Sequence, residues 1–167
     1  DREGLGAHAR KARVALEHNH VYRVLFEGGE VLAETAGRIK FRAGGRKELP
    51  AVGDWVANKP DPSESRATIR GILARRTQFT RKAPGKPTAE QVLAANVDVA
   101  FIVFGFDKPV NPRAIERYVA LVRRSGAEPV VSLNKSDLCA DIAAAVEEAR
   151  AAASGVPVHA VETRTVT

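Results

Sequence analysis

Asn134, Lys135, Ser136 and Asp137 form an Asn-Lys-x-Asp motif directly after an apolar segment at 129–133. A carboxylate such as that of Asp137 can accept hydrogen bonds from the ring N1–H and the exocyclic amine of guanine, a pattern that adenine does not offer. Leaving it unpaired in a buried site would cost on the order of 1–3 kcal/mol. The Asn134 amide can contact the O6/N7 side of the base, and the aliphatic stem of Lys135 can lie across the ring. The motif therefore predicts a guanine-binding site.

An isolated match to this motif also occurs in ordinary polar turns, so its meaning depends on the elements around it. Apolar strands are expected at 99–104, 129–133 and 156–161, and helices at 112–125 and 141–153. Strand 99–104 is continuously apolar, which is typical of a strand covered on both faces. This order predicts a parallel sheet with right-handed crossovers. Ligands of such sheets bind beyond the carboxyl ends of the strands, which is where the motif stands.

Residues 10–82 follow a different pattern, in which short β-branched and aromatic segments alternate with turns. Strands are expected at 21–26, 30–35, 37–42, 52–57, 67–73 and 78–80, with no convincing helix among them. In segment 37–42, Ile39 and Phe41 alternate with basic residues, which predicts one apolar and one basic strand face. The set predicts a small closed barrel of the five-stranded oligonucleotide-binding (OB-fold-like) type, although strand spacing alone does not separate it from an SH3-like barrel.

Three parts are therefore expected along the chain. Residues 1–82 form the basic barrel, 83–90 a linker rich in Pro and Lys, and 91–167 a partial α/β domain. Thr88 to Gln91 has the sequence of a capping box and predicts a brief turn of helix.

The excess positive charge lies entirely in the first half of the chain. Residues 1–86 contain 18 Lys and Arg against 10 Asp and Glu, whereas residues 87–167 contain 8 against 10. Such a domain attracts polyanions through phosphate contacts and counterion release. The alternative is a surface whose charge serves solubility. RNA-binding candidates are the basic residues around Phe79 and those of segment 37–42: Arg75, Arg76, Arg81, Lys82, Arg38, Lys40 and Arg42. Trp55 is assigned to the barrel core, because Val52 and Val56 surround it.

Several classes of protein are disfavoured by composition. No apolar run approaches the roughly 20 residues that cross a bilayer, and the N-terminus lacks the pattern of a secretory signal. The single cysteine, Cys139, forms no internal disulfide, and the four histidines show no metal-ligand grouping. We expect a cytoplasmic protein with no metal site in this chain.

The chain contains no phosphate-binding loop of the form Gly-x-x-x-x-Gly-Lys-Ser/Thr. Gly85-Lys86 comes nearest, but Thr80 stands where the first Gly belongs and Pro87 where the hydroxyl belongs. In the usual order of GTPase motifs this loop precedes the base-reading motif. Either the guanine interpretation is wrong, or the order is permuted and the loop lies beyond Thr167. The catalytic residues are unknown, and this chain alone is not expected to hydrolyse GTP by that mechanism.

At this point the sequence resembles a known family, the ribosome-small-subunit-dependent GTPases of the RsgA (YjeQ) group. The resemblance rests on segments in the family's order at 51–56, 74–77, 91–98, 113–118, 125–131 and 134–138. It implies an N-terminal oligonucleotide-binding barrel, a circularly permuted GTPase domain that 91–167 begins, and a C-terminal zinc-binding domain. It further implies GTP or GDP with Mg²⁺, a role in late maturation of the small ribosomal subunit, and contact with its rRNA. Asn134, Lys135 and Asp137 take the guanine-specificity role, and a monomer is expected.

The sequence departs from this family after Val161, where Glu162-Thr163 replaces the usual Ser-Ala pair beside the guanine oxygen. Two other interpretations stay open from sequence. One is a non-enzymatic RNA-binding barrel with a degenerate α/β appendage. The other is an α/β enzyme for another substrate, in which the Asn-Lys-x-Asp match is accidental.

Overall fold

The computed structural model describes residues 9–60, 66–82 and 90–162. The chain divides into two compact units between Val97 and Asp98. Of the linker expected at 83–90, only Glu90 is among the described residues, and it begins a strand. No helix within the described ranges has the length and apolarity that crossing a bilayer requires.

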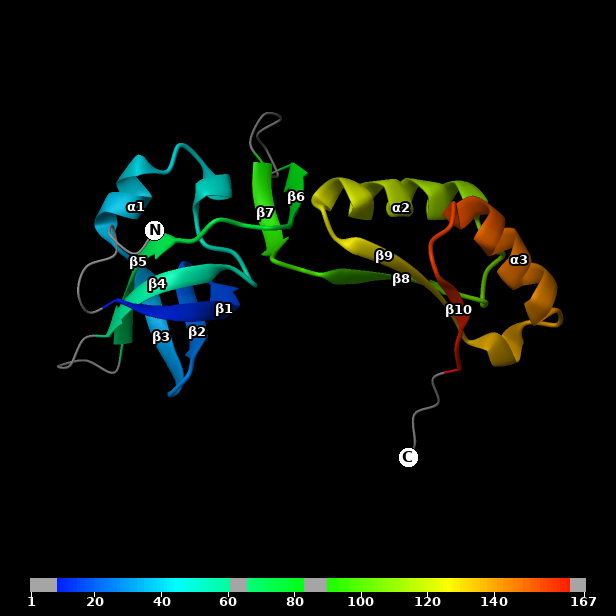
Figure 1. Cartoon of the computed structure of the whole chain (residues 1–167), viewed down its shortest axis with the longest axis horizontal. Helices are drawn as coiled ribbons and strands as arrows, with labels where there is room; N and C mark the ends of the chain where they lie inside the picture. Colours follow the sequence, from blue (N-terminus) through cyan, green and yellow to red (C-terminus); the bar gives the residue numbers. More distant parts are fainter. Residues whose placement is uncertain (1–8, 61–65, 83–89, 163–167) are drawn as a thin grey trace. The chain divides into compact units, whose positions relative to one another are not determined.

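The first unit is built on a closed barrel of five strands (Figure 1). Its strands are β1 Arg10–His18, β2 Val21–Phe26, β3 Gly29–Thr35, β4 Trp55–Pro60 and β5 Arg66–Ile72. They pair in the order β1-β2-β3-β5-β4, and β4 closes the barrel on β1. Alternate residues point inward, so Val14, Tyr22, Val24, Val56 and Ile69 form a buried core. The predicted five-stranded barrel is confirmed.

Segment 37–42 is not a strand as expected from sequence, but the α-helix α1, Gly37–Arg42. The Ile39 and Lys40 amides both donate to the Ala36 carbonyl, and the Ala43 amide donates to Ile39. Ile39 packs against the barrel core, whereas Phe41 is 92% exposed. The two apolar side chains therefore share no face, because residues two apart on a helix point in different directions. A short 3₁₀ turn, η1 Arg46–Glu48, follows.

A hairpin completes the first unit. It consists of β6 Gln78–Lys82 and β7 Glu90–Ala95, which pair antiparallel. Glu90 and Gln91 are thus in a strand, and the turn of helix predicted there is wrong. The hairpin is joined to the barrel through Asn96, whose side-chain amide donates to the Gly53 carbonyl at 3.1 Å and accepts from the Arg76 amide at 2.9 Å.

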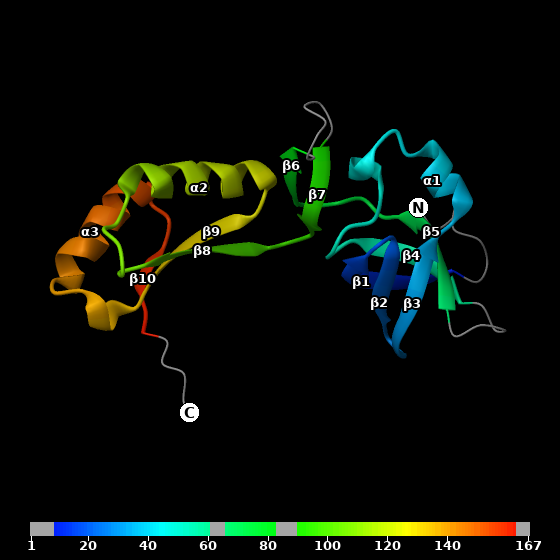
Figure 2. The ribbon, with the colours of Figure 1, turned by 180° about the vertical axis from the view of Figure 1, so that it is seen from behind.

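The second unit is a three-stranded parallel sheet with two helices (Figures 1 and 2). Its elements are β8 Val99–Gly105, α2 Pro112–Ser125, β9 Glu128–Asn134, η2 Ser136–Leu138, α3 Ile142–Ala153 and β10 Val158–Ala160. Asn111 caps α2, Asp141 caps α3, and Gly126 ends α2 in the left-handed conformation. The predicted alternation of strands and helices is confirmed.

One expectation for this sheet is wrong. The strand order is β10-β9-β8, so right-handed crossovers in one direction place both helices on the same face of the sheet. The opposite face of β8 is open in the described chain, with Phe101 69% and Val103 61% exposed. Strand 99–104 is therefore covered on one face and not on both.

Candidate functional site

The Asn-Lys-x-Asp motif lies at the carboxyl edge of the parallel sheet. Asn134 is the last residue of β9 and pairs with Gly105, the last residue of β8. Lys135 then adopts the left-handed conformation, with φ of 60°, and Asp137 lies exposed in η2. The left-handed residue turns the chain sharply away from the strand direction. The structure therefore places all four predicted residues at the edge where ligands of parallel sheets bind.

The segments after all three strands of this sheet meet at the motif. The Phe106 amide donates to the Asn134 carbonyl at 3.0 Å, which holds the segment after β8 against the end of β9. The Ser136 amide donates to the Val161 carbonyl at 3.3 Å, which brings in the segment after β10. The Asn134 side-chain oxygen adds a hydrogen bond that it accepts from the Lys135 amide at 2.7 Å. These contacts hold the motif in place without using the carboxylate of Asp137, which keeps its acceptor capacity.

Asp107 is a neighbour of the motif that sequence reasoning missed. Its carboxylate lies 3.3 Å from the Lys135 ammonium. The hydrogen bond from Lys135 lowers the pKa of Asp107, so the carboxylate is charged at neutral pH. The register of the sheet brings them together: Gly105 and Asn134 are paired, so residues just beyond each strand end are neighbours.

Arg75, predicted to bind RNA, has its guanidinium engaged inside the first unit. It forms two hydrogen bonds with the fully buried Asp54 carboxylate, at 2.8 and 2.7 Å. It also donates to the carbonyls of Lys47 and Leu49. A third hydrogen bond to the Asp54 carboxylate, from the Ala51 amide, holds it in place. This geometry favours a structural role for Arg75.

The remaining predicted RNA-binding residues are divided between two elements. Arg81 and Lys82 are exposed on β6, and the exposed Arg76 precedes this strand. Arg38, Lys40 and Arg42 belong to α1, so they do not form the basic strand face expected from sequence. Arg38 donates to the Arg70 carbonyl at 3.0 Å, and Lys40 is exposed.

A second basic and aromatic cluster, missed from sequence, lies on the outer surface of the barrel. Trp55 is half-buried and not part of the core cluster, so its assignment to the core is wrong. The Lys11 ammonium lies 4.2 Å and the Arg13 guanidinium carbon 5.5 Å from the centroid of its ring. Both are cation–π distances. The alternation of Lys11 and Arg13 with Ala12 and Val14 was the available sequence signal.

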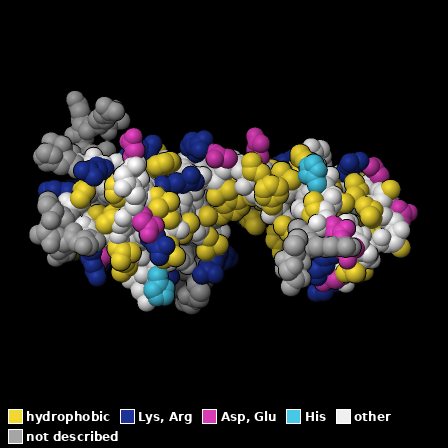
Figure 3. All heavy atoms as spheres, turned by 90° about the horizontal axis from the view of Figure 1, so that it is seen from below, with side chains coloured by type: hydrophobic (Ala, Val, Ile, Leu, Met, Phe, Trp, Pro, Cys, Tyr) yellow, Lys and Arg dark blue, Asp and Glu magenta, His cyan; other side chains and the backbone are white. Residues whose placement is uncertain are grey.

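Basic side chains of the first unit are interspersed with hydrophobic ones on the face shown in Figure 3. Cations beside aromatic rings suit single-stranded RNA, since they contact phosphates while the rings stack on bases. Lys11, Arg13 and Trp55, together with Arg81 and Lys82, are therefore the residues whose placement best suits RNA.

Comparison with known proteins agrees with this geometry. A family model described as RsgA GTPase matches residues 72–167. The chain belongs to the RsgA GTPase family. Among its relatives, the small ribosomal subunit biogenesis GTPase RsgA of Opitutus terrae is 49% identical over 156 residues, covering 88% of this chain and 42% of that protein. The protein of the same name from Syntrophotalea carbinolica is 42% identical over 154 residues, with the same coverage. The chain thus spans less than half the length of these relatives.

Solved structures show the same fold. YjeQ from Thermotoga maritima matches with a TM-score of 0.68 and 22% identity, over 92% of this chain and 52% of that one. YloQ, a circularly permuted GTPase, matches with a TM-score of 0.66 and 22% identity, over 98% of this chain and 55% of that one. The expected barrel followed by a parallel-sheet domain with the fold of these GTPases is confirmed.

Membership of the RsgA family does not favour the alternative of a non-enzymatic barrel with a degenerate appendage. Glu162, where the sequence departs from the family's Ser-Ala pair, lies close to the motif. It is exposed and directly follows Val161, whose carbonyl accepts a hydrogen bond from the Ser136 amide. Thr163 lies outside the described residues.

Proposed function

We propose that the full-length protein hydrolyses GTP during late maturation of the small ribosomal subunit in the cytoplasm, acting as a monomer. This chain supplies the guanine-reading motif, and its barrel contacts the rRNA. The family and the names of the relatives support this function. The observation that carries it is the position of Asp137, exposed at the carboxyl edge of a parallel sheet.

In this proposal, three residues of the motif have separate tasks. Asp137 accepts hydrogen bonds from the N1–H and the exocyclic amine of guanine, and Asn134 contacts the opposite edge. The stem of Lys135 lies along the base, while Asp107 holds its ammonium. The motif binds guanine nucleotides and discriminates against adenine nucleotides. It supplies no general base for the chemical step.

Phosphoryl transfer to water depends on positioning and on neutralisation of phosphate charge, which Mg²⁺ supplies in such enzymes. No three His, Cys, Asp or Glu side chains are grouped as a metal site in the described part of the chain. We therefore assign neither Mg²⁺ nor the family's zinc to described residues of this chain.

Guanine recognition is tested by Asp137→Asn in the full-length protein. An amide donates where the carboxylate accepted, so it opposes the guanine amine and suits xanthine, which has a carbonyl there. We expect affinity for GDP to fall by at least about 100-fold, and xanthosine diphosphate to bind better than GDP. Isothermal titration measures both, with Glu148→Gln, an exposed carboxylate of α3, as the control. An unchanged affinity for GDP would overturn the assignment.

RNA binding by the barrel is tested with ribosomal RNA fragments at several salt concentrations. We expect affinity to fall steeply with salt, because phosphate contacts release counterions. Lys11→Glu and Lys82→Glu should each weaken binding by roughly tenfold at low salt. Lys108→Glu, an exposed lysine of the second unit, serves as the control for net charge. Equal effects of all three variants would show attraction without a defined surface.

A further inference from the structure

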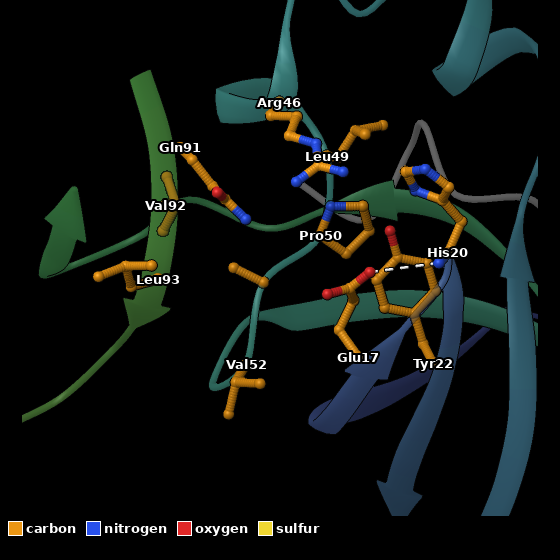
Figure 4. A pocket seen from close by; sticks show the side chains of 11 residues that line it. Glu17, His20, Tyr22, Arg46, Leu49, Pro50, Val52, Gln91, Val92 and Leu93 are labelled. Carbon is orange, nitrogen blue, oxygen red and sulfur yellow. Dashed lines mark hydrogen bonds between the residues drawn. The ribbon is translucent and has the colours of Figure 1, made fainter. Parts of the chain in front are cut away.

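A pocket of about 180 Å³ lies in the first unit, between the barrel and the hairpin (Figure 4). Its polar lining comes from three places: Glu17, His20 and Tyr22 near the β1–β2 turn, Arg46 in η1, and Gln91 in β7. Leu49, Pro50 and Leu93 add apolar walls. The volume holds far more than one water, which needs about 10–15 Å³. It is below the roughly 300 Å³ of pockets for whole drug-sized ligands, so a single ring system fits it.

Tyr22 places a hydroxyl inside this pocket. The residue belongs to the barrel core and is only 1% exposed, and Figure 4 shows its phenol oxygen pointing between Pro50 and His20. Burial raises the pKa of Tyr22 to about 12, so the hydroxyl keeps its proton at neutral pH and can donate. Among the hydrogen bonds of the described residues, none involves this hydroxyl. The hydroxyl faces the pocket and can act there as donor or acceptor to a ligand.

Glu17 fixes the kind of ligand that the pocket can take. Its carboxylate accepts a hydrogen bond from the His20 amide at 3.2 Å, which positions it beside Tyr22 (Figure 4). Because Arg46 also lines the pocket, the Glu17 carboxylate does not by itself exclude an anion, but it accepts hydrogen bonds and donates none. It attracts N–H donors, such as the exocyclic amine of a nucleobase. Arg46 and Gln91 offer further donors, and Gln91 a further acceptor, from the other walls.

We propose that this pocket receives one nucleobase of single-stranded RNA, with Glu17 accepting from its exocyclic amine and the Tyr22 hydroxyl bonding its edge. The proposal rests on the RNA-binding part of the proposed function and adds a base-reading site to it. Flat apolar rings with polar edges match the mixed lining, and RNA-binding proteins read bases that are splayed out of the strand. Adenine, cytosine and guanine have an exocyclic amine and uracil has none, so the pocket prefers amine-bearing bases over uracil.

The test compares fluorescein-labelled oligo(A), oligo(C) and oligo(U) of nine nucleotides binding to the 167-residue chain by fluorescence anisotropy at fixed salt. We expect oligo(A) and oligo(C) to bind about tenfold tighter than oligo(U), a ratio that one or two hydrogen bonds supply. Tyr22→Phe keeps the ring and removes the hydroxyl, and Glu17→Gln keeps an oxygen that accepts from the His20 amide. Each should lower the ratio to within about threefold and leave oligo(U) affinity unchanged.

Tyr118→Phe is the matched control, because it removes the hydroxyl of the chain's other tyrosine, which lies on α2. Thermal melts followed by circular dichroism confirm that each variant folds. If Tyr22→Phe does not fold, Glu17→Gln, which changes an exposed residue, decides the test. A ratio that both variants retain, or an equal loss of affinity for all three oligomers, overturns the base pocket. Absence of any RNA binding by the unchanged chain also overturns the RNA function of the barrel, so the two failures are distinguishable.

Discussion

At the scale of single residues, the ion pair of Asp54 and Arg75 should contribute strongly to the free energy of unfolding. Arg75→Ala would leave the carboxylate of Asp54 fully buried with its ionic partner gone. We expect the free energy of unfolding to fall by about 3–5 kcal/mol, because an uncompensated buried charge is costly. Urea denaturation followed by circular dichroism measures this loss.

Arg76→Ala is the control for that experiment, since the neighbouring side chain is exposed. We expect it to change the free energy of unfolding by less than about 1 kcal/mol. Equal losses for the two variants would contradict the structural role of Arg75. In that case, the guanidinium of Arg75 would be available for RNA as the sequence suggested.

These residues show which part of a site a sequence can predict. The guanine motif could be predicted because its chemistry is contained in four consecutive residues. The role of Arg75 could not, because its partner Asp54 is 21 positions away and only the fold brings them together. The role of Asp107 could not be predicted for the same reason, since its contact with Lys135 depends on the register of β8 against β9. Charge is visible in a sequence, but the partner of a charge is not.

At the scale of elements, α1 separates two interpretations of the same six residues. In the helix, Ile39 packs on the barrel core while Phe41 is exposed to solvent. Ile39→Ala should therefore lower the free energy of unfolding by about 2 kcal/mol or more. Phe41→Ala should change it by less than about 0.5 kcal/mol. A strand would place both side chains on one face, so similar costs in a urea titration would favour the strand.

Segment 37–42 was wrongly predicted as a strand because it is short. Over six residues, alternation of apolar and basic side chains fits a strand, and fewer than two helical turns are available to show a period of 3.6. The capping-box sequence at Thr88 predicted a turn of helix for a different reason. Residues 90 and 91 lie in β7 instead, because contacts with residues outside the box fix this strand. Glu90 forms an ion pair with Lys47 at 2.6 Å, and β7 pairs with β6. Long-range pairing overrode the local signal.

Gly53 controls how the hairpin joins the barrel. Its φ of 89° is left-handed, and a side chain there would overlap the Ala95 carbonyl. Gly53→Ala should lower the free energy of unfolding by about 1–3 kcal/mol, the cost of a strained backbone conformation. Gly45→Ala is the control, because a methyl group there meets no neighbouring atom within 4 Å. Comparable thermal melting temperatures for the two variants would contradict a close junction at Gly53.

At the scale of the whole molecule, the change from short strands to strand–helix alternation predicted two architectures, and both are present. The barrel type could be predicted from short, regularly spaced strands, and the parallel sheet from its buried β9 and capped helices. The strand set itself was only partly right, because β1 was not predicted, 37–42 is a helix, and 78–80 belongs to the β6–β7 hairpin. The point of division was harder to see. The compact units part between Val97 and Asp98 because Asn96 and Val52 bind the hairpin to the barrel, and those contacts are long-range.

The open face of β8 determines how this chain should behave in solution. Phe101 and Val103 point away from the helices and are largely exposed, and an exposed apolar strand at a sheet edge promotes aggregation. Replacing both with threonine keeps β propensity and removes apolar surface. We expect slower aggregation by light scattering and a melting temperature within about 4 °C of the original, equivalent to under about 1 kcal/mol. Ile102→Thr, a buried control on the helix-covered face, should lower the melting temperature much further. A similar loss in the double variant would mean that this face of β8 is covered in solution.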